Sequence, residues 1–128
     1  MTRIDLWPNE FGVTDENVPI AILREQASLL PEKTGWKLQG KVSTRVEGKS
    51  FEHYFYIVVP ALDDYHYRLF KVKHEIVPYP LWIDSEVFSQ TDYEVGTADE
   101  FIRALKTIFT SEQTKKLIGT LLRQIESY

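Results

Sequence analysis

The chain has 128 residues, a formal net charge of -4 at pH 7 and no cysteine, and 43% of its residues are hydrophobic. This length fits one domain with its own core, and the missing cysteines exclude disulfide and thiolate chemistry. The acidic balance disfavours bulk attraction to nucleic acid or to anionic membranes. No apolar run approaches the roughly 20 residues of a membrane span, and no signal peptide is recognisable. We therefore expect a single cytoplasmic domain over 1–128.

The first 17 residues contain several residues that break helices and strands, so residues 1–17 are predicted to form an irregular arm. Trp7 and Phe11 are expected to anchor this arm to the body. A helix is predicted over 18–30, because apolar residues recur at helical spacing behind a plausible N-cap, Asn17. A proline and a glycine just beyond this segment are expected to end the helix.

Strands are predicted next, because polar and apolar residues alternate over 36–46, 51–60 and 65–76. A hairpin loop and a short turn separate them. After two prolines, Leu81–Ile83 is predicted to form a short fourth strand at the edge of the sheet. Residues 84–96 hold acidic residues and no lysine or arginine, which predicts an acidic surface loop.

Two capping boxes, Thr97–Glu100 and Thr110–Gln113, each precede an amphipathic apolar stripe and predict two C-terminal helices. The predicted fold is therefore α+β, in the order α-β-β-β-β-α-α. Its sheet is a four-stranded antiparallel meander, and the N-terminal helix and the two C-terminal helices pack on one face.

Pairing Val46 with Phe51, and Leu62 with Tyr65, predicts which side chains share a face of this sheet. One face should form the core with the helices. It holds Trp36, Leu38, Val42, Phe55, Ile57, Val59, Phe70 and Val72. The opposite face is predicted to be polar and aromatic. It carries the candidate binding residues Lys37, Lys41, Arg45, Tyr54, Tyr56, Tyr67, Lys71 and Lys73.

Tyrosine rings beside lysine amines can bind an acidic protein surface, and they can also bind single-stranded nucleic acid by stacking and charge. The same pattern also suits an ordinary solvated sheet, since tyrosine favours strands and lysine stems pack over rings. Self-association through this face, as a homodimer, is a third interpretation.

The predicted pairing places His53 opposite His74 near one end of the sheet. Such a pair could bind a metal or move protons, and Glu75 is the nearest carboxylate for a small enzyme. The pair lacks a third ligand, and the favoured interpretation is two histidines satisfied by hydrogen bonds at the margin of the core. No glycine-rich phosphate-binding motif occurs. The sequence therefore assigns no catalytic residue, no metal and no cofactor.

Two segments, 56–70 and 100–109, resemble a family of small bacterial proteins with no assigned activity. The resemblance implies a bacterial origin and carries over no functional residue. Small acidic bacterial domains often serve as immunity proteins, chaperones or adaptors. We therefore expect a non-enzymatic binding module whose partner is another protein, with an enzyme or metal-binding protein and a nucleic-acid binder as the alternatives.

Overall fold

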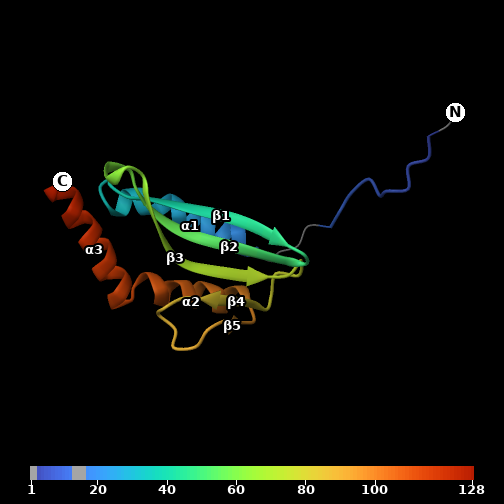
Figure 1. Ribbon diagram of the computed structural model, residues 1–128. Helices are drawn as coiled ribbons and strands as arrows, with labels where there is room; N and C mark the ends of the chain where they lie inside the picture. The colour runs from blue at the N-terminus through green and yellow to red at the C-terminus, as the bar shows by residue number, and fades with distance from the viewer. Residues whose placement is uncertain (1–2, 13–16) are drawn as a thin grey trace.

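A computed structural model describes residues 3–12 and 17–128 of the chain (Figure 1). Its helices and strands follow in chain order. They are α1 (Pro19–Lys33), β1 (Gln39–Glu47), β2 (Ser50–Val59), the 3-10 helix η1 (Pro60–Leu62), β3 (Tyr65–His74), β4 (Leu81–Asp84), β5 (Tyr93–Val95), α2 (Ala98–Phe109) and α3 (Glu112–Ser127). The α+β class and the order of the predicted elements are confirmed, with one strand more than expected.

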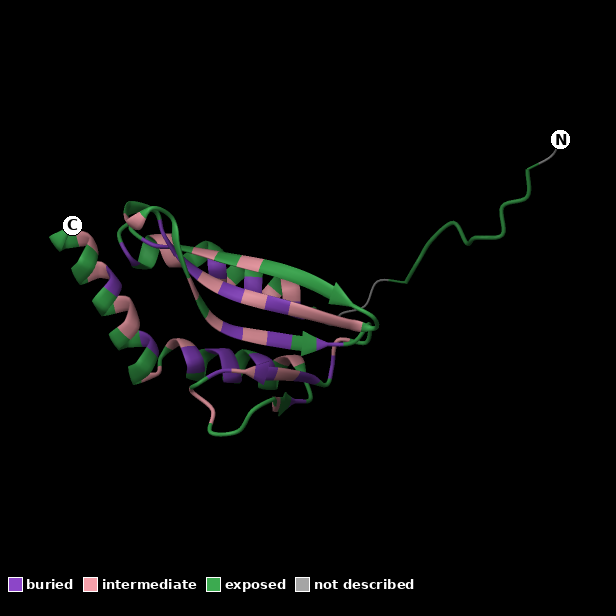
Figure 2. Ribbon diagram, in the orientation of Figure 1, coloured by how far each residue is buried: buried purple, intermediate pink, exposed green. Residues whose placement is uncertain are grey.

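The sheet is an antiparallel meander in the order β1-β2-β3-β4-β5. Helices α1, α2 and α3 lie on the same side of it (Figure 1). Buried and half-buried residues alternate along much of β2 and β3, as expected for a sheet with one covered face (Figure 2). The predicted packing of all three helices on one face is confirmed.

The fifth strand, β5, lies inside the segment for which the sequence predicts only an acidic loop. It pairs with β4, so β4 is an interior strand and its predicted edge position is wrong. A strand of three residues is too short to show the period of two that identifies strands in a sequence. The left-handed residue Asp92, with φ of 56°, turns the chain into it.

Helix α1 begins and ends slightly later than predicted. Its N-cap is Val18, not Asn17, and no side chain caps it. Pro31 lies inside the last turn rather than beyond it, and its carbonyl accepts hydrogen bonds from the N–H groups of Thr34 and Trp36. Gly35, with φ of 60°, then reverses the chain as glycine readily does after a helix.

Trp36 is predicted from the sequence to begin the first strand and to lie in the core, and both predictions are wrong. Its φ is 66° and its side chain is 73% exposed, because the helix-ending turn continues through it. The core position at this end of the sheet belongs to Leu38, which is fully buried.

The N-terminal arm is not held down by Trp7 and Phe11 as expected. These side chains are 75% and 68% exposed, and their rings contact each other with centroids 6.2 Å apart. Residues 3–12 run away from the body in an extended, irregular path (Figure 1). The irregular conformation is confirmed for these residues, the predicted anchoring is wrong, and positions 1–2 and 13–16 of the arm lie outside the described residues.

The core consists of two clusters on the helix side of the sheet. The larger one joins α1 and α2 to the middle of the sheet, with Leu23, Phe70 and Phe101 among its fully or nearly fully buried members. The smaller one joins α3 to the other end of β2 through Leu121 and Ile57. Helix α3 therefore extends the core rather than standing apart from it.

The first hairpin has the predicted register, with Val46 opposite Phe51 and Lys41 opposite Tyr56. The second hairpin does not, because residues 60–64 form a longer connection than the predicted turn. Helix η1 and two left-handed aspartates occupy that connection, so Tyr65 pairs with Val59 rather than with Leu62. The register of β3 is shifted by two residues over its second half, which leaves each residue on its predicted face.

A β-bulge at Leu69 changes the faces in the first half of β3. Phe55 pairs with Phe70, but the next residue of β2, Tyr56, pairs with Arg68, so one extra residue of β3 lies between them. Because side chains alternate along a strand, this single residue exchanges the faces of the positions before it. Arg68 is thereby opposite Tyr56, and Tyr67 is opposite Ile57 on the helix side.

Both C-terminal helices begin with side-chain caps. Thr97 accepts a hydrogen bond from the N–H of Glu100, as predicted, and the Glu100 carboxylate accepts one from the N–H of Gly96. The second cap is Ser111, which accepts from the N–H of Thr114, so the predicted cap at Thr110 is displaced by one residue.

Gly40 allows α1 to lie directly on β1. A Cβ atom at this position would stand 2.6 Å from the Cα and 2.7 Å from the carbonyl oxygen of Ala27. Those are backbone atoms, so relief requires the helix to move. We expect Gly40→Ala to lower the free energy of unfolding by about 1–3 kcal/mol, the usual cost of overpacking, as measured by urea denaturation.

Gly119→Ala is the matched control for this substitution. Gly119 lies in α3, and apart from its chain neighbours and the adjacent backbone of its own helix no atom of the described residues lies within 4 Å of the place that a Cβ would take. Alanine should therefore raise stability by about 0.5–1 kcal/mol through helix propensity. Equal effects of the two substitutions would contradict the close contact at Gly40.

Candidate functional site

The face of the sheet that lies opposite the helices is called the open face here. Cross-strand pairing arranges its side chains in three rows. The rows are Lys41–Tyr56–Arg68, Ser43–Tyr54–Lys71–Asp84 and Arg45–Glu52–Lys73–Trp82–Glu94. Each row therefore places one aromatic ring directly beside at least one cation, and Glu52, Asp84 and Glu94 lie among them.

Tyr54 lies near the centre of the open face and is held from several sides. Its hydroxyl donates a 2.9 Å hydrogen bond to Glu52, whose carboxylate lies 3.4 Å from the Lys71 amine. The Arg68 guanidinium carbon lies 5.6 Å from the centre of the Tyr54 ring, within the range of a cation–π contact. The ring is therefore fixed by groups on two strands.

These contacts shift two pKa values. The hydrogen bond from Tyr54, together with Lys71, lowers the pKa of the Glu52 carboxyl, while the same hydrogen bond raises the pKa of the Tyr54 hydroxyl. Glu52 therefore stays ionised and Tyr54 stays a donor at neutral pH. The Glu52 carboxylate is thus already satisfied by these two neighbours.

Aromatic contacts continue from Tyr54 along the face. The Tyr54 and Tyr56 rings stack with centroids 6.4 Å apart, and the His66 ring meets Tyr56 edge-on at 6.0 Å. Both tyrosines are half-buried, whereas His66 and Arg68 are exposed. The result is a row of ordered rings that presents its outer side to solvent.

The structure brings six of the eight predicted binding residues together on the open face. They are Lys41, Arg45, Tyr54, Tyr56, Lys71 and Lys73. Lys37 is not among them, because it precedes β1 and lies in the turn after α1. Tyr67 is also not among them, because the bulge at Leu69 turns it to the helix side.

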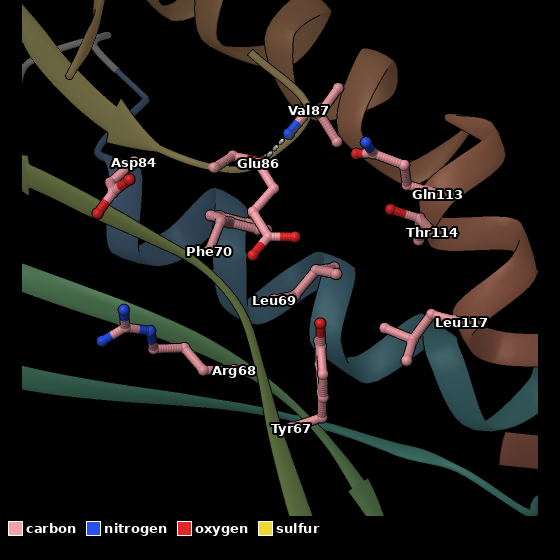
Figure 3. A pocket seen from close by; sticks show the side chains of 11 residues that line it. Tyr67, Arg68, Leu69, Phe70, Asp84, Glu86, Val87, Gln113, Thr114 and Leu117 are labelled. Atoms are coloured by element: carbon pink, nitrogen blue, oxygen red, sulfur yellow. Dashed lines mark hydrogen bonds between the residues drawn. The ribbon is translucent and has the colours of Figure 1, made fainter. Parts of the chain in front are cut away.

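Tyr67 lines a pocket of about 260 Å³ between β3, the segment after β4 and the start of α3 (Figure 3). Its hydroxyl points into the space shared with Glu86, Gln113 and Thr114, whereas Arg68 points away from it (Figure 3). The pocket belongs to the covered side of the sheet. Tyr67 and Arg68, adjacent in sequence, thus serve opposite faces.

Five residues of the open face were not predicted from the sequence: His66, Arg68, Trp82, Asp84 and Glu94. Arg68 was missed because the bulge cannot be read from alternation. Trp82 and Asp84 were assigned to no face, although the apolar neighbours of Trp82, Leu81 and Ile83, are fully buried. Alternation within that short strand already indicated that Trp82 points the other way.

The histidine pair is close, although its predicted pairing is wrong. His53 is opposite Val72, and His74 is opposite Phe51, because the register of β3 is shifted by two residues. The two rings still meet diagonally on the covered side, with the Nε2 atoms 2.8 Å apart. Both residues are buried, at 3% and 8% exposure.

Hydrogen bonds use all four ring nitrogens of this pair. The Glu75 carbonyl lies 2.6 Å from His74 Nδ1 and can only accept, so Nδ1 carries the proton of a neutral His74. His74 Nε2 therefore accepts from His53 Nε2, and His53 Nδ1 accepts from the Thr44 hydroxyl at 2.9 Å. Burial is the largest cause that lowers the pKa of His53 to about 4, and electrostatic interactions with His74 and Arg24 lower it further because they disfavour a second positive charge.

A neutral, fully bonded pair has no lone pair left for a metal, and its protons have assigned acceptors. The short distance meets the proximity requirement of a proton relay, but the Glu75 side chain is exposed and only its carbonyl joins the network. Among residues 3–12 and 17–128, no cluster of three or more potential metal ligands occurs. The geometry fits a structural role at the margin of the core.

No family model matches this chain, and no curated protein and no solved structure shows significant similarity to it. In the part of the chain that the structure describes, no helix combines the length and the apolar character needed to cross a bilayer. A function must therefore be inferred from the geometry of the chain itself.

Proposed function

We propose that this chain is a non-enzymatic, cytoplasmic protein-binding module of the immunity, chaperone or adaptor type. Its open face docks onto an acidic surface of a partner protein. Tyrosine, tryptophan and arginine, the residue types enriched at binding hot spots, all occur on this face.

Charge supports an acidic partner. The open face carries five basic residues and four acidic ones, Glu47, Glu52, Asp84 and Glu94, so its net charge is +1, whereas the whole chain carries -4. The basic residues are Lys41, Arg45, Arg68, Lys71 and Lys73. These cations, which outnumber the carboxylates on this face although not in the whole chain, orient an acidic surface during encounter.

The observation that carries the proposal is the fixation of Tyr54. Its hydroxyl donates a hydrogen bond to Glu52, the Arg68 guanidinium lies over its ring, and the Tyr56 ring stacks beside it. A side chain that is already ordered loses little conformational entropy when a partner covers it. Tyrosine and arginine are among the residue types that contribute most of the binding energy at hot spots, and here they lie in contact at the centre of the face.

Affinity capture from the native host tests this proposal. The wild-type chain should retain one protein at a stoichiometric ratio, and Tyr54→Ala should weaken that complex at least tenfold, the effect expected at a hot spot. Lys41→Glu should weaken it through charge and should lower the association rate. Calorimetry or biosensor titration of the captured protein supplies both measurements.

Lys116→Glu is the matched control, because it makes the same charge change at an exposed position on α3, away from the open face. It should leave the affinity unchanged. Capture of no stoichiometric protein would refute the proposal. A complex with single-stranded oligonucleotide that weakens steeply with salt would instead favour nucleic-acid binding.

A further inference from the structure

A groove on the helix side of the molecule separates α1 from α2. Two adjoining hollows of about 360 Å³ and about 230 Å³ form it, and both are bounded by Gln26 and Phe109. Side chains of the sheet, Phe55 and Ile57, lie at its floor. The groove is therefore an apolar channel between two helices that both pack on the same sheet.

Partly exposed apolar side chains and two cations form the walls of this groove. Leu29 of α1 and Ile102 of α2 line it at 41% and 46% exposure. Lys33 and Lys106 lie at its two sides. A segment that combines large apolar side chains with carboxylates would match this lining.

The N-terminal arm is such a segment. Ile4, Leu6, Trp7 and Phe11 are 78%, 89%, 75% and 68% exposed, which is a high concentration of apolar surface for so short a segment. The arm also carries the carboxylates Asp5 and Glu10. It runs away from the body to which it belongs (Figure 1), so it presents these side chains to another molecule.

The arm is longer than the groove. Helix α1 borders the groove from Ile22 to Lys33, a distance of about 17 Å at 1.5 Å per residue. The arm from Ile4 to Phe11 spans about 23 Å when extended at 3.3 Å per residue. An extended arm is therefore long enough to fill the groove along its whole length, and it brings two carboxylates to a groove that is lined by two lysines.

We infer that the arm of one copy occupies the groove between α1 and α2 of a second copy. Because each chain has both an arm and a groove, the exchange is reciprocal and closes a symmetric dimer. The groove lies on the covered side of the sheet, so the open face stays free for a partner. The dimer therefore does not depend on the proposed function, and either can fail alone.

Sedimentation or light scattering at a series of concentrations measures this exchange. The wild-type chain should form a dimer that dissociates on dilution. Leu6→Asp combined with Trp7→Asp should raise the dimer dissociation constant at least tenfold, and Leu29→Asp and Ile102→Asp should do the same from the groove side. The arm variant changes only exposed side chains, so its circular dichroism should match the wild type.

Mixing distinguishes arm exchange from other contacts. The arm variant keeps an intact groove and the Leu29→Asp variant keeps an intact arm, so the two together should form heterodimers while each alone stays monomeric. Ile76→Asp, at a position 79% exposed on neither the arm nor the groove, is the control and should remain dimeric. Two results would overturn the inference. One is a wild-type chain that is monomeric at every concentration, including one whose arm folds back into its own groove. The other is a dimer that persists in the variant that lacks Leu6 and Trp7.

Discussion

Phe70→Ala is expected to lower the free energy of unfolding by about 3–5 kcal/mol, the range for removing a buried aromatic side chain. Phe70 is 2% exposed and stacks on Phe55 with ring centroids 5.1 Å apart, and it meets Phe109 of α2 at 5.8 Å. Its removal leaves a cavity where two strands and a helix meet. Urea denaturation followed by circular dichroism measures the loss.

Tyr56→Ala is the comparison for this prediction. Tyr56 is an aromatic residue of similar size on the neighbouring strand, but its ring lies half-buried on the open face. We expect its removal to cost about 1 kcal/mol, because part of its surface is already hydrated and no helix packs against it. Equal losses at the two positions would contradict the division of the sheet into a covered and an open face.

The parts of the fold that were predicted correctly depend on local chemistry. The capping threonine Thr97 and the glycine Gly35 act on their own neighbours, and their roles can be read from a few adjacent residues. The first hairpin has a short loop, so strand alternation and loop length together determine its register. These features need no information from distant residues.

The prediction errors occur where the conformation of the backbone depends on more than a regular local pattern. The connection over 60–64 takes the shape of a 3-10 turn with two left-handed aspartates, which displaces the register of the second hairpin. The bulge at Leu69 then lets Tyr67 and Phe70 both point toward the helices. No local pattern distinguishes a regular strand from one with an extra residue, since that choice depends on what packs against it.

The candidate site shows the same division. Its β1 and β2 residues were placed correctly because the first hairpin was, whereas the β3 contribution was mixed. Lys71 and Lys73 lie on the predicted face because the register of β3 is shifted by two residues there. Tyr67 does not, because the bulge puts Arg68 on the open face in its place. Arg68 therefore stands opposite Tyr56, and with Trp82 it takes the place of Lys37 and Tyr67, so the face keeps five cations and three aromatic rings of tyrosine or tryptophan.

Acidification is expected to destabilise the fold through His53. Its pKa is about 4 in the folded chain and about 6.5 when unfolded, because burial beside His74 disfavours the charged ring. Below pH 6.5 the unfolded chain binds a proton that the folded chain does not bind. The free energy of unfolding should therefore fall by up to about 1.4 kcal/mol per pH unit as the pH drops from 6.5 toward 4, and should be fully retained above 6.5.

Denaturation midpoints measured between pH 7 and pH 5.5 isolate this effect, because Glu52, with its ordinary pKa of 4.5 in the unfolded chain, stays about nine-tenths ionised down to pH 5.5. His53→Gln removes the titrating ring and keeps an amide that can donate to His74. The slope of the unfolding free energy against pH should therefore fall by an amount that corresponds to as much as one proton taken up on unfolding. His66→Gln removes an exposed histidine of the open face and serves as the matched control. If His53→Gln leaves the slope intact, the buried pair is not what links stability to pH, since the proton taken up on unfolding must then bind elsewhere.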